Sequence, residues 1–292
     1  MVRPLVRDEG GLSTLWSFVG VLVLVIAILG VYYGYVVPKF APPPIRSQLG
    51  DTVHVNYVGS FQTTGLVFDT SILAIGQDNA SYPKAFSFTW HPTWSPLSVE
   101  IGAGGVVKGF EIGVQGLAEG ESKTVAVPPD LGYGSADPAK FIVKSILEPV
   151  PVRFTMNASD FLVAYHIPAV SGMNVTDPFW GWSATVSVAE TVVTVTNSPI
   201  LGQIVHPYRA WMAQVVSIDY GKNAGRGEIL VRHLLDSSSV DRVGAKDANG
   251  KVLFVVSAVN TDAGTYTLNY NDPTKGRVLI FQVTMVSISR LF

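Results

Sequence analysis

The residue types that carry most enzyme chemistry are sparse in this 292-residue chain. It has no cysteine, which excludes thiol catalysis, disulfides and cysteine-based metal centres. Five histidines are scattered without any H-x-x-x-H spacing: His54, His91, His166, His206 and His233. We interpret them as structural or surface residues, and we interpret Glu119 and Glu121 as a solvated turn. The sequence therefore predicts no metal site and no cofactor.

The most distinctive stretch is "GFEIGVQGLAEGESKTVAVPPDLGYG", residues 109–134. It contains, in this order, an amphipathic segment interrupted by glycines, a Thr/Val strand, two prolines and an aromatic residue between glycines. It contains no nucleophile–base pair. The whole chain is 48% apolar and 14% charged with a net charge of −2, which argues against disorder and against nucleic acid as a partner. The stretch therefore leaves open which function needs this order of residues but no reactive side chain, and the rest of the chain has to answer it.

An uncharged apolar run precedes the body of the protein. We expect residues 1–12 to form a tail, residues 13–37 a transmembrane helix and residues 38–47 a proline-rich linker. A cleaved signal peptide would have a shorter apolar region and a small-x-small cleavage site, so we predict a single-pass anchor. Lys/Arg counts on the two sides are equal; the low-lysine body and the sequons at Asn79, Asn157 and Asn174 favour an extracytoplasmic location for it.

The sequence of the body predicts an α+β protein made mostly of antiparallel strands. Period-2 alternation predicts strands at 51–61, 96–102, 121–128, 184–197, 210–218, 252–260, 265–271 and 277–288. Only residues 106–117 have the three- and four-residue apolar spacing of a helix, at Val107, Phe110, Val114 and Leu117. Residues 135–147 and 227–238 are further short-helix candidates. We therefore expect a long β-sheet packed on one short helix.

Two later segments resemble each other. "TNSPILGQ" leads into "AWMAQVVSI", and "YNDPTKGR" leads into "LIFQVTMVSI", each after a glycine-containing segment and two strand-like runs. The shared N-x-P and V-S-I at similar offsets favour a small β-module that occurs twice over a coincidence between strand–turn–strand sequences.

In their order, the segments "GDTVHVNYVGSF", "GLVFDTS" and "PLSVEIGAGGVVKGFEIGVQGLAEGESKTVAVPPDLGYG" resemble the FKBP-type peptidyl-prolyl isomerases across residues 50–134, apart from an insertion at about residues 72–95. "SADPAKFIVKSIL…VSGMNV…TVTNSPILGQ" resembles the SlyD-like and archaeal long-type branch, in which a β-rich insert-in-flap chaperone module interrupts the domain. The resemblance implies an isomerase domain at 48–141 plus 206–219, an insert-in-flap-like domain at 142–205 and a second insert-like β-module with return strand at 220–292. Either the strand with Trp211 or the strand with Phe281 could close the isomerase sheet, and we favour Trp211, which is nearer in sequence.

The same resemblance implies the site residues. The catalytic positions it assigns are Tyr57, Phe68, Asp69, Val106, Val107, Phe110 and Tyr133. The implied polypeptide-binding positions are Leu97, Trp211, Phe281, Met173, Trp180 and Trp182. Among them, Phe110 would form the pocket floor, Asp69 the acidic group near the twisting carbonyl, Val106 a backbone N–H donor and Tyr133 a hydroxyl donor. Trp180, Trp182 and Met173 would either line an apolar holding surface or fill the core of the insert.

Rotation about an X–Pro bond has a barrier of about 20 kcal/mol, because amide resonance resists it. A catalyst can lower that barrier by binding the twisted amide better than the planar one, with no covalent step. The resemblance thus predicts a membrane-anchored prolyl isomerase and folding chaperone whose partners are unfolded or proline-containing polypeptides. The alternatives are a non-catalytic polypeptide-binding chaperone, or an accessory or structural subunit of a membrane or cell-surface assembly.

Overall fold

The computed structural model describes residues 10–36 and 43–290, so the expected tail and linker fall mostly outside the described residues. The chain divides into two units, residues 1–45 and 46–292. In the first unit, helix α1 spans Gly10–Val31 and continues into a π-helical turn, η1, at Tyr32–Val36. Within it, Trp16–Tyr35 is long and apolar enough to cross a membrane, since 20 helical residues extend about 30 Å. This helix lies where the sequence predicts one.

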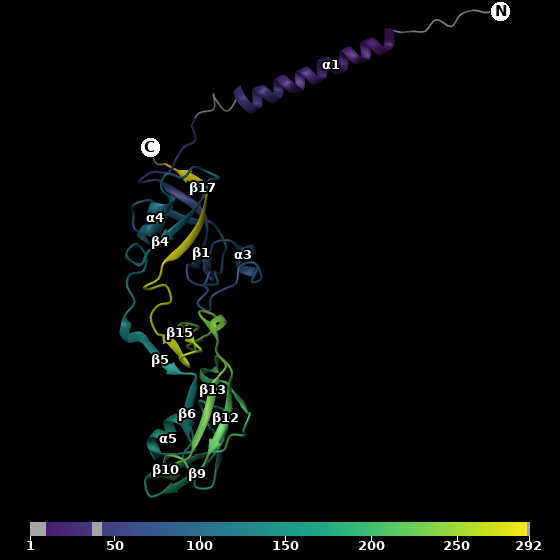
Figure 1. Cartoon of the computed structure of the whole chain (residues 1–292). Helices are drawn as coiled ribbons and strands as arrows, with labels where there is room; N and C mark the ends of the chain where they lie inside the picture. Colours follow the sequence, from purple (N-terminus) through teal and green to yellow (C-terminus); the bar gives the residue numbers. More distant parts are fainter. Residues whose placement is uncertain (1–9, 37–42, 291–292) are drawn as a thin grey trace, which may run out of the picture. The chain divides into compact units, whose positions relative to one another are not determined.

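The second unit begins with sheet 1, an antiparallel sheet in the order β2-β1-β17-β4 with β3 also paired to β1. Its strands are β1 (Thr52–Phe61), β2 (Val67–Thr70), β3 (Leu97–Glu100), β4 (Ser122–Val127) and β17 (Leu279–Ser289). Figure 1 shows the consequence for the chain: β1, near the start of the colour scale, lies beside the yellow β17. The two ends of the body therefore meet in one sheet.

One face of sheet 1 packs on helix α4 (Lys108–Val114), the helix expected within residues 106–117. Phe110 and Val114 are buried in the core that this helix forms with the sheet. A Cβ on Gly113 would lie 2.6 Å from the Val125 side chain, so the glycine permits the close approach of α4 to β4. Between β2 and β3, the insertion forms only the short helix α3 (Leu73–Gln77).

An ion pair joins the two ends of sheet 1. Arg290, just beyond β17, donates from Nε and Nη2 to the two carboxylate oxygens of Asp51, both at 2.7 Å. Asp51 immediately precedes β1, and the hydrogen bonds from Arg290 hold the pKa of its carboxyl below the usual value. The bidentate pair fixes the register at the point where β1 begins and β17 ends.

The chain between β4 and β17 forms three further antiparallel sheets. In the sequence, the strands of each sheet enclose the segment that forms the next sheet. Sheet 2 contains β5 (Phe141–Ser145), β14 (Gly244–Lys246), β15 (Val252–Asn260) and β16 (Thr265–Asn269). Sheet 3 contains β6 (Leu147–Pro151), β11 (Ile204–Val205), β12 (Ala213–Asp219) and β13 (Glu228–His233). Sheet 4 contains β7 (Arg153–Asn157), β8 (Asn174–Thr176), β9 (Ser183–Ala189) and β10 (Val192–Asn197), and helix α5 (Ala158–Tyr165) follows β7. Short 3-10 turns complete the second unit: η2 (Pro129–Leu131), η3 (Pro138–Lys140), η4 (Pro207–Arg209), η5 (Asn223–Gly225) and η6 (Ser237–Ser239).

The N-x-P asparagines tie the exit of a nested segment to its entrance. Asn197, at the end of sheet 4, donates from Nδ2 to the carbonyl of Pro151 at 3.1 Å. Asn271, after sheet 2, donates in the same way to the carbonyl of Asp137 at 3.1 Å. Both asparagines are buried. The repeated N-x-P therefore has the same structural role in both places: it closes the base of an inserted module.

Two predictions about this region are wrong. The strand after Trp211, β12, pairs with β11 and β13 in sheet 3, whereas β17 with Phe281 closes sheet 1 between β1 and β4. Residues 206–219 therefore do not belong to sheet 1, and 142–205 is not a separate unit, because sheets 2 and 3 draw strands from both sides of it. Apolar and polar residues alternate in both strands, so this pattern fits either of them as the closing strand of sheet 1. Only β17 supplies Leu279, Val283 and Met285 to the core of that sheet.

The predictions of short helices at residues 135–147 and 227–238 are also wrong. The first contains β5 and the second contains β13, with only the turns η3 and η6 nearby. β5 pairs over Phe141–Ser145 with β16, and β13 pairs over Glu228–Arg232 with β6, so each strand has a partner distant in sequence. Such tertiary pairing overrides a local apolar spacing that also fits a helix.

Candidate functional site

A cavity of about 210 Å³ opens in the core between sheet 1 and helix α4. Its walls combine aromatic and aliphatic side chains with a single carboxylate. The lining residues are Tyr57, Phe68, Asp69, Leu97, Gly105, Val106, Val107, Phe110, Tyr133 and Phe281. All seven residues expected at catalytic positions, together with Leu97 and Phe281, thus lie around one cavity.

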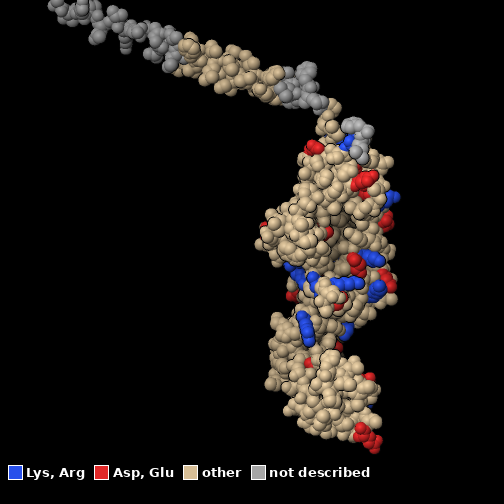
Figure 2. Space-filling view, turned by 180° about the vertical axis from the view of Figure 1, so that it is seen from behind, with Lys and Arg blue, Asp and Glu red and all other residues tan. Residues whose placement is uncertain are grey.

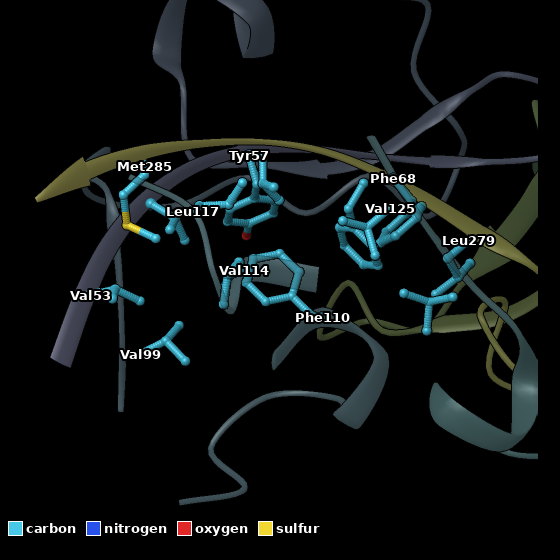
Figure 3. Packing of buried hydrophobic residues seen from close by; sticks show 14 of the residues in the cluster. Val53, Tyr57, Phe68, Val99, Phe110, Val114, Leu117, Val125, Leu279 and Met285 are labelled. Atoms are coloured by element: carbon cyan, nitrogen blue, oxygen red, sulfur yellow. The ribbon is translucent and has the colours of Figure 1, made fainter. Parts of the chain in front are cut away.

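The aromatic rings of the cavity meet edge to face. The Phe110 ring lies 5.9 Å from Tyr57 and 5.2 Å from Phe281, at interplanar angles of 85° and 88°. Phe68 meets Phe281 at 5.8 Å and 87°. Figure 3 shows Phe110 facing Tyr57 across the core, with Phe68 further along it. Perpendicular rings leave apolar faces toward the cavity, which suits a compact apolar ring such as that of proline.

Strand register brings these rings together. Gly59 on β1 lies opposite both Asp69 on β2 and Phe281 on β17. A Cβ at Gly59 would lie 2.8 Å from Phe68 Cζ and 3.0 Å from Phe281 Cε1. A side chain at this position would displace both rings, so the glycine leaves room for two walls of the cavity.

Asp69 is held from two sides. The Tyr57 hydroxyl donates to Asp69 Oδ2 at 2.9 Å, and His91 Nε2 lies 2.6 Å from Asp69 Oδ1. Burial and the negative charge of Asp69 raise the pKa of the Tyr57 hydroxyl, so Tyr57 keeps its proton and remains a donor at neutral pH. Both carboxylate oxygens are thereby engaged and fixed in orientation.

Tyr133 lies at the rim, where it is 45% exposed. Burial of the rest of its side chain, followed by the charges of Asp69 and Asp272, raises the pKa of its hydroxyl. The hydroxyl stays protonated at neutral pH and is free to donate to a bound ligand. The site therefore offers an apolar pocket, a fixed carboxylate and one rim donor, an arrangement suited to binding without covalent chemistry.

Reasoning from the sequence did not place His91 at the site. It comes from the insertion at residues 72–95, and its ring packs on Trp94 at 5.6 Å, while Trp94 in turn contacts Trp90 at 5.8 Å. The run "TWHPTW", residues 89–94, combines a histidine and two tryptophans with a proline beside Asp69's strand. That unusual composition is the signal that could have marked it.

The remaining polypeptide-binding candidates lie elsewhere. Trp180 and Trp182 stack at 5.2 Å in the core of sheet 3, where they are 7% and 1% exposed. Met173 packs against the core of sheet 4, and Trp211 is buried in the core of sheet 2. The two stacked tryptophans therefore fill a core, and the interpretation of them as an exposed holding surface is wrong. Within the described residues, no group of three metal-ligating side chains occurs.

Comparisons with known proteins agree with the geometry. Residues 44–149 match the family model of the FKBP-type peptidyl-prolyl cis-trans isomerases. The short-type peptidyl-prolyl cis-trans isomerase of Methanocaldococcus jannaschii is 36% identical over 88 residues, which cover 30% of this chain and 51% of that protein. The peptidyl-prolyl cis-trans isomerase FKBP2 of Mus musculus is 32% identical over 91 residues, 31% of this chain and 51% of that protein.

A third relative, the peptidyl-prolyl cis-trans isomerase FKBP53 of Arabidopsis thaliana, is 33% identical over 89 residues, 30% of this chain and 14% of that protein. The chain thus spans about half the length, or less, of these curated relatives. The family match stops before β17, which completes the sheet from outside the matched residues. The predicted domain type is confirmed for residues 44–149, which match an FKBP-type peptidyl-prolyl cis-trans isomerase domain.

Proposed function

We propose that the protein is a peptidyl-prolyl cis-trans isomerase that is held at a membrane by α1 and acts on X–Pro bonds of extracytoplasmic polypeptides. One observation carries this proposal: the expected pocket residues surround a single apolar cavity with Asp69 fixed at its edge. The cavity would bind the proline ring and exclude water, while the fixed carboxylate and the Tyr133 hydroxyl would favour the twisted amide over the planar one.

Substitutions of Asp69 and Tyr133 test this mechanism. Asp69→Asn keeps the shape but removes the charge that Tyr57 and His91 orient, and a hydrogen bond to a charged group contributes about 1.5–3 kcal/mol. We expect kcat/KM on an X–Pro peptide to fall about 10- to 100-fold. In the Tyr133→Phe variant, kcat/KM should fall about 5-fold, because one neutral hydrogen bond of about 1 kcal/mol is lost.

The matched control is Tyr220→Phe, which removes the hydroxyl of a tyrosine that is 64% exposed and absent from the cavity lining. Its rate should equal that of the wild type. Proline-limited exchange measured by NMR or by a coupled assay provides the readout. If the wild-type chain does not accelerate exchange over the spontaneous rate, the isomerase function is wrong.

Holding of unfolded polypeptides is a second function, favoured by the surface of the innermost module. Leu162 and Val163 of α5 are 49% and 74% exposed, and Ile167 and Val170 just after it are 40% and 59% exposed. Apolar side chains gathered in this way favour a surface that binds other chains, as in the insert-in-flap chaperones that this region resembles.

Substitution of the exposed apolar side chains tests the holding function. The double variant Leu162→Gln/Val163→Gln changes two side chains that are 49% and 74% exposed and leaves Trp180 and Trp182 in the core of sheet 3. We expect this variant to suppress aggregation of an unfolded client less than the wild type does, while it keeps wild-type kcat/KM on a short X–Pro peptide. Undiminished suppression by the double variant would contradict the assignment of this surface.

A further inference from the structure

A second and larger cavity adjoins the isomerase cavity. It has a volume of about 570 Å³ and shares Phe68, Asp69 and Tyr133 with the smaller one. Its size falls within the range of about 300–1,000 Å³ typical of ligand sites. A polypeptide whose proline occupies the small cavity would therefore continue into the large one.

The far wall of this large cavity is formed by the nested region. Lys140 is the last residue of η3, Lys251 immediately precedes β15, and Tyr270 to Thr274 come from the segment after β16. Hydrogen bonds anchor that segment to the rim of the isomerase site: Asp137 N donates to Asn271 Oδ1 at 2.9 Å, and Gly276 N donates to the carbonyl of Gly134 at 2.8 Å. The wall is therefore fixed next to Tyr133.

The charges in the cavity differ in how they are engaged. Asp69 accepts from Tyr57 and lies against His91, and Asp272 Oδ1 accepts from the backbone N–H and the hydroxyl of Thr274 at 2.9 and 2.6 Å. The ammonium groups of Lys140 and Lys251 have no ion-pair or hydrogen-bond partner in the part of the chain that the structure describes. Figure 2 shows Lys and Arg side chains around the middle of the body, with Asp and Glu side chains among them. Both carboxylates keep their charge but already accept hydrogen bonds, so the two ammonium groups are the charged groups of the cavity that can pair with a ligand.

We propose that the large cavity binds the segment flanking the substrate proline, and that Lys140 and Lys251 select an acidic side chain in that segment. The inference rests on the proposed isomerase function, because it places the proline in the small cavity. Each lysine is exposed and reaches its partner through solvent, so the preference should be several-fold and should weaken as salt screens it.

The experiment compares proline peptides that differ only in one residue, Glu, Gln or Lys, placed two positions before or after the proline. The full chain is assayed for kcat/KM on each peptide, and Kd is measured separately by fluorescence anisotropy with labelled peptides. We expect a Glu peptide on one side of the proline to bind about 5- to 10-fold tighter than its Gln counterpart at low salt, and the Lys peptide to bind more weakly than either. In 0.5 M NaCl the difference should shrink to below about 2-fold.

The double variant Lys140→Gln/Lys251→Gln should abolish the Glu-over-Gln ratio in Kd. The control variant is Lys123→Gln, an exposed lysine of β4 outside both cavities, which should keep the ratio. Equal Kd values for the Glu and Gln peptides in the wild type, or a ratio that survives the double variant, would overturn the inference. Charge-selective binding without any accelerated exchange would support the cavity assignment and reject the isomerase function, so the two failures are distinguishable.

Discussion

A chain that ends at Gly276 should fail to form the isomerase domain, although it keeps every residue matched by the family model. It lacks β17, which pairs with β1 from Thr52↔Ser289 to Phe61↔Leu279 and with β4 from Ser122↔Thr284 to Val127↔Leu279. Loss of a central strand leaves two unpaired edges and removes Phe281 from the cavity.

The energies support this expectation. Four side chains of β17 are at most 5% exposed: Leu279, Phe281, Val283 and Met285. Burial of each contributes about 1.5–3 kcal/mol, so their removal costs about 6–12 kcal/mol. That loss is comparable with the whole stability of about 5–15 kcal/mol of a typical domain. We expect the truncated chain to show no isomerase activity and no dispersed amide signals from residues 46–134 in an NMR spectrum.

An internal deletion provides the control. Gly134 and Gly276 are hydrogen-bonded at 2.8 Å, so residue 135 can be joined to residue 276, which removes sheets 2, 3 and 4 but leaves β17 in place. This much shorter chain should fold and catalyse exchange on short peptides. If the chain ending at Gly276 instead kept a folded isomerase domain, another strand would have to close sheet 1, as the sequence-based preference for Trp211 supposed.

The parts of the fold predicted correctly from sequence are those whose signal is local. β1, β3, β4 and α4 each follow from periodicity within about a dozen residues, and the motif order identified the pocket-lining residues. The closing strand could not be predicted in this way, because the runs before Asp219 and before Ser289 alternate equally well. The shorter sequence distance favoured the nearer run. However, the entropy cost of closing a loop grows only slowly with its length, so a distant strand is penalised little more than a near one. Nested modules whose ends are joined also shorten the effective loop.

Burial was equally hard to predict from the sequence for residue types that suit both a core and an exposed surface. Trp180 and Trp182 suit an exposed apolar surface as well as a core; the Trp182 Nε1 donates to the buried Asn197 at 2.9 Å, a contact that only the fold creates. His91 was missed for the complementary reason. It lies in an insertion without a motif, and its proximity to Asp69 depends on how that loop folds back over β2.

Breaking the ion pair between Asp241 and Arg277 should destabilise the protein by about 3 kcal/mol, the lower end of the range for removing one partner of a buried pair. Asp241, which is 2% exposed and has a φ of 58°, lies just before β14 of sheet 2. It accepts from Arg277 Nη1 and Nη2 at 2.8 and 2.7 Å, next to β17, and so joins sheet 2 to sheet 1.

Asp241→Asn is the appropriate change, because asparagine tolerates the left-handed backbone and keeps the shape while leaving the guanidinium without its counter-charge. The urea midpoint should fall clearly, and the double variant with Arg277→Met should lose less than the sum of the two single variants. The matched control is Lys222→Met, which breaks the pair with Glu228 at 2.7 Å, where the lysine side chain is 55% exposed. Solvent screens that pair, so its midpoint should barely move. Equal shifts in Asp241→Asn and Lys222→Met would mean that the buried pair does not hold the nested region on the isomerase domain.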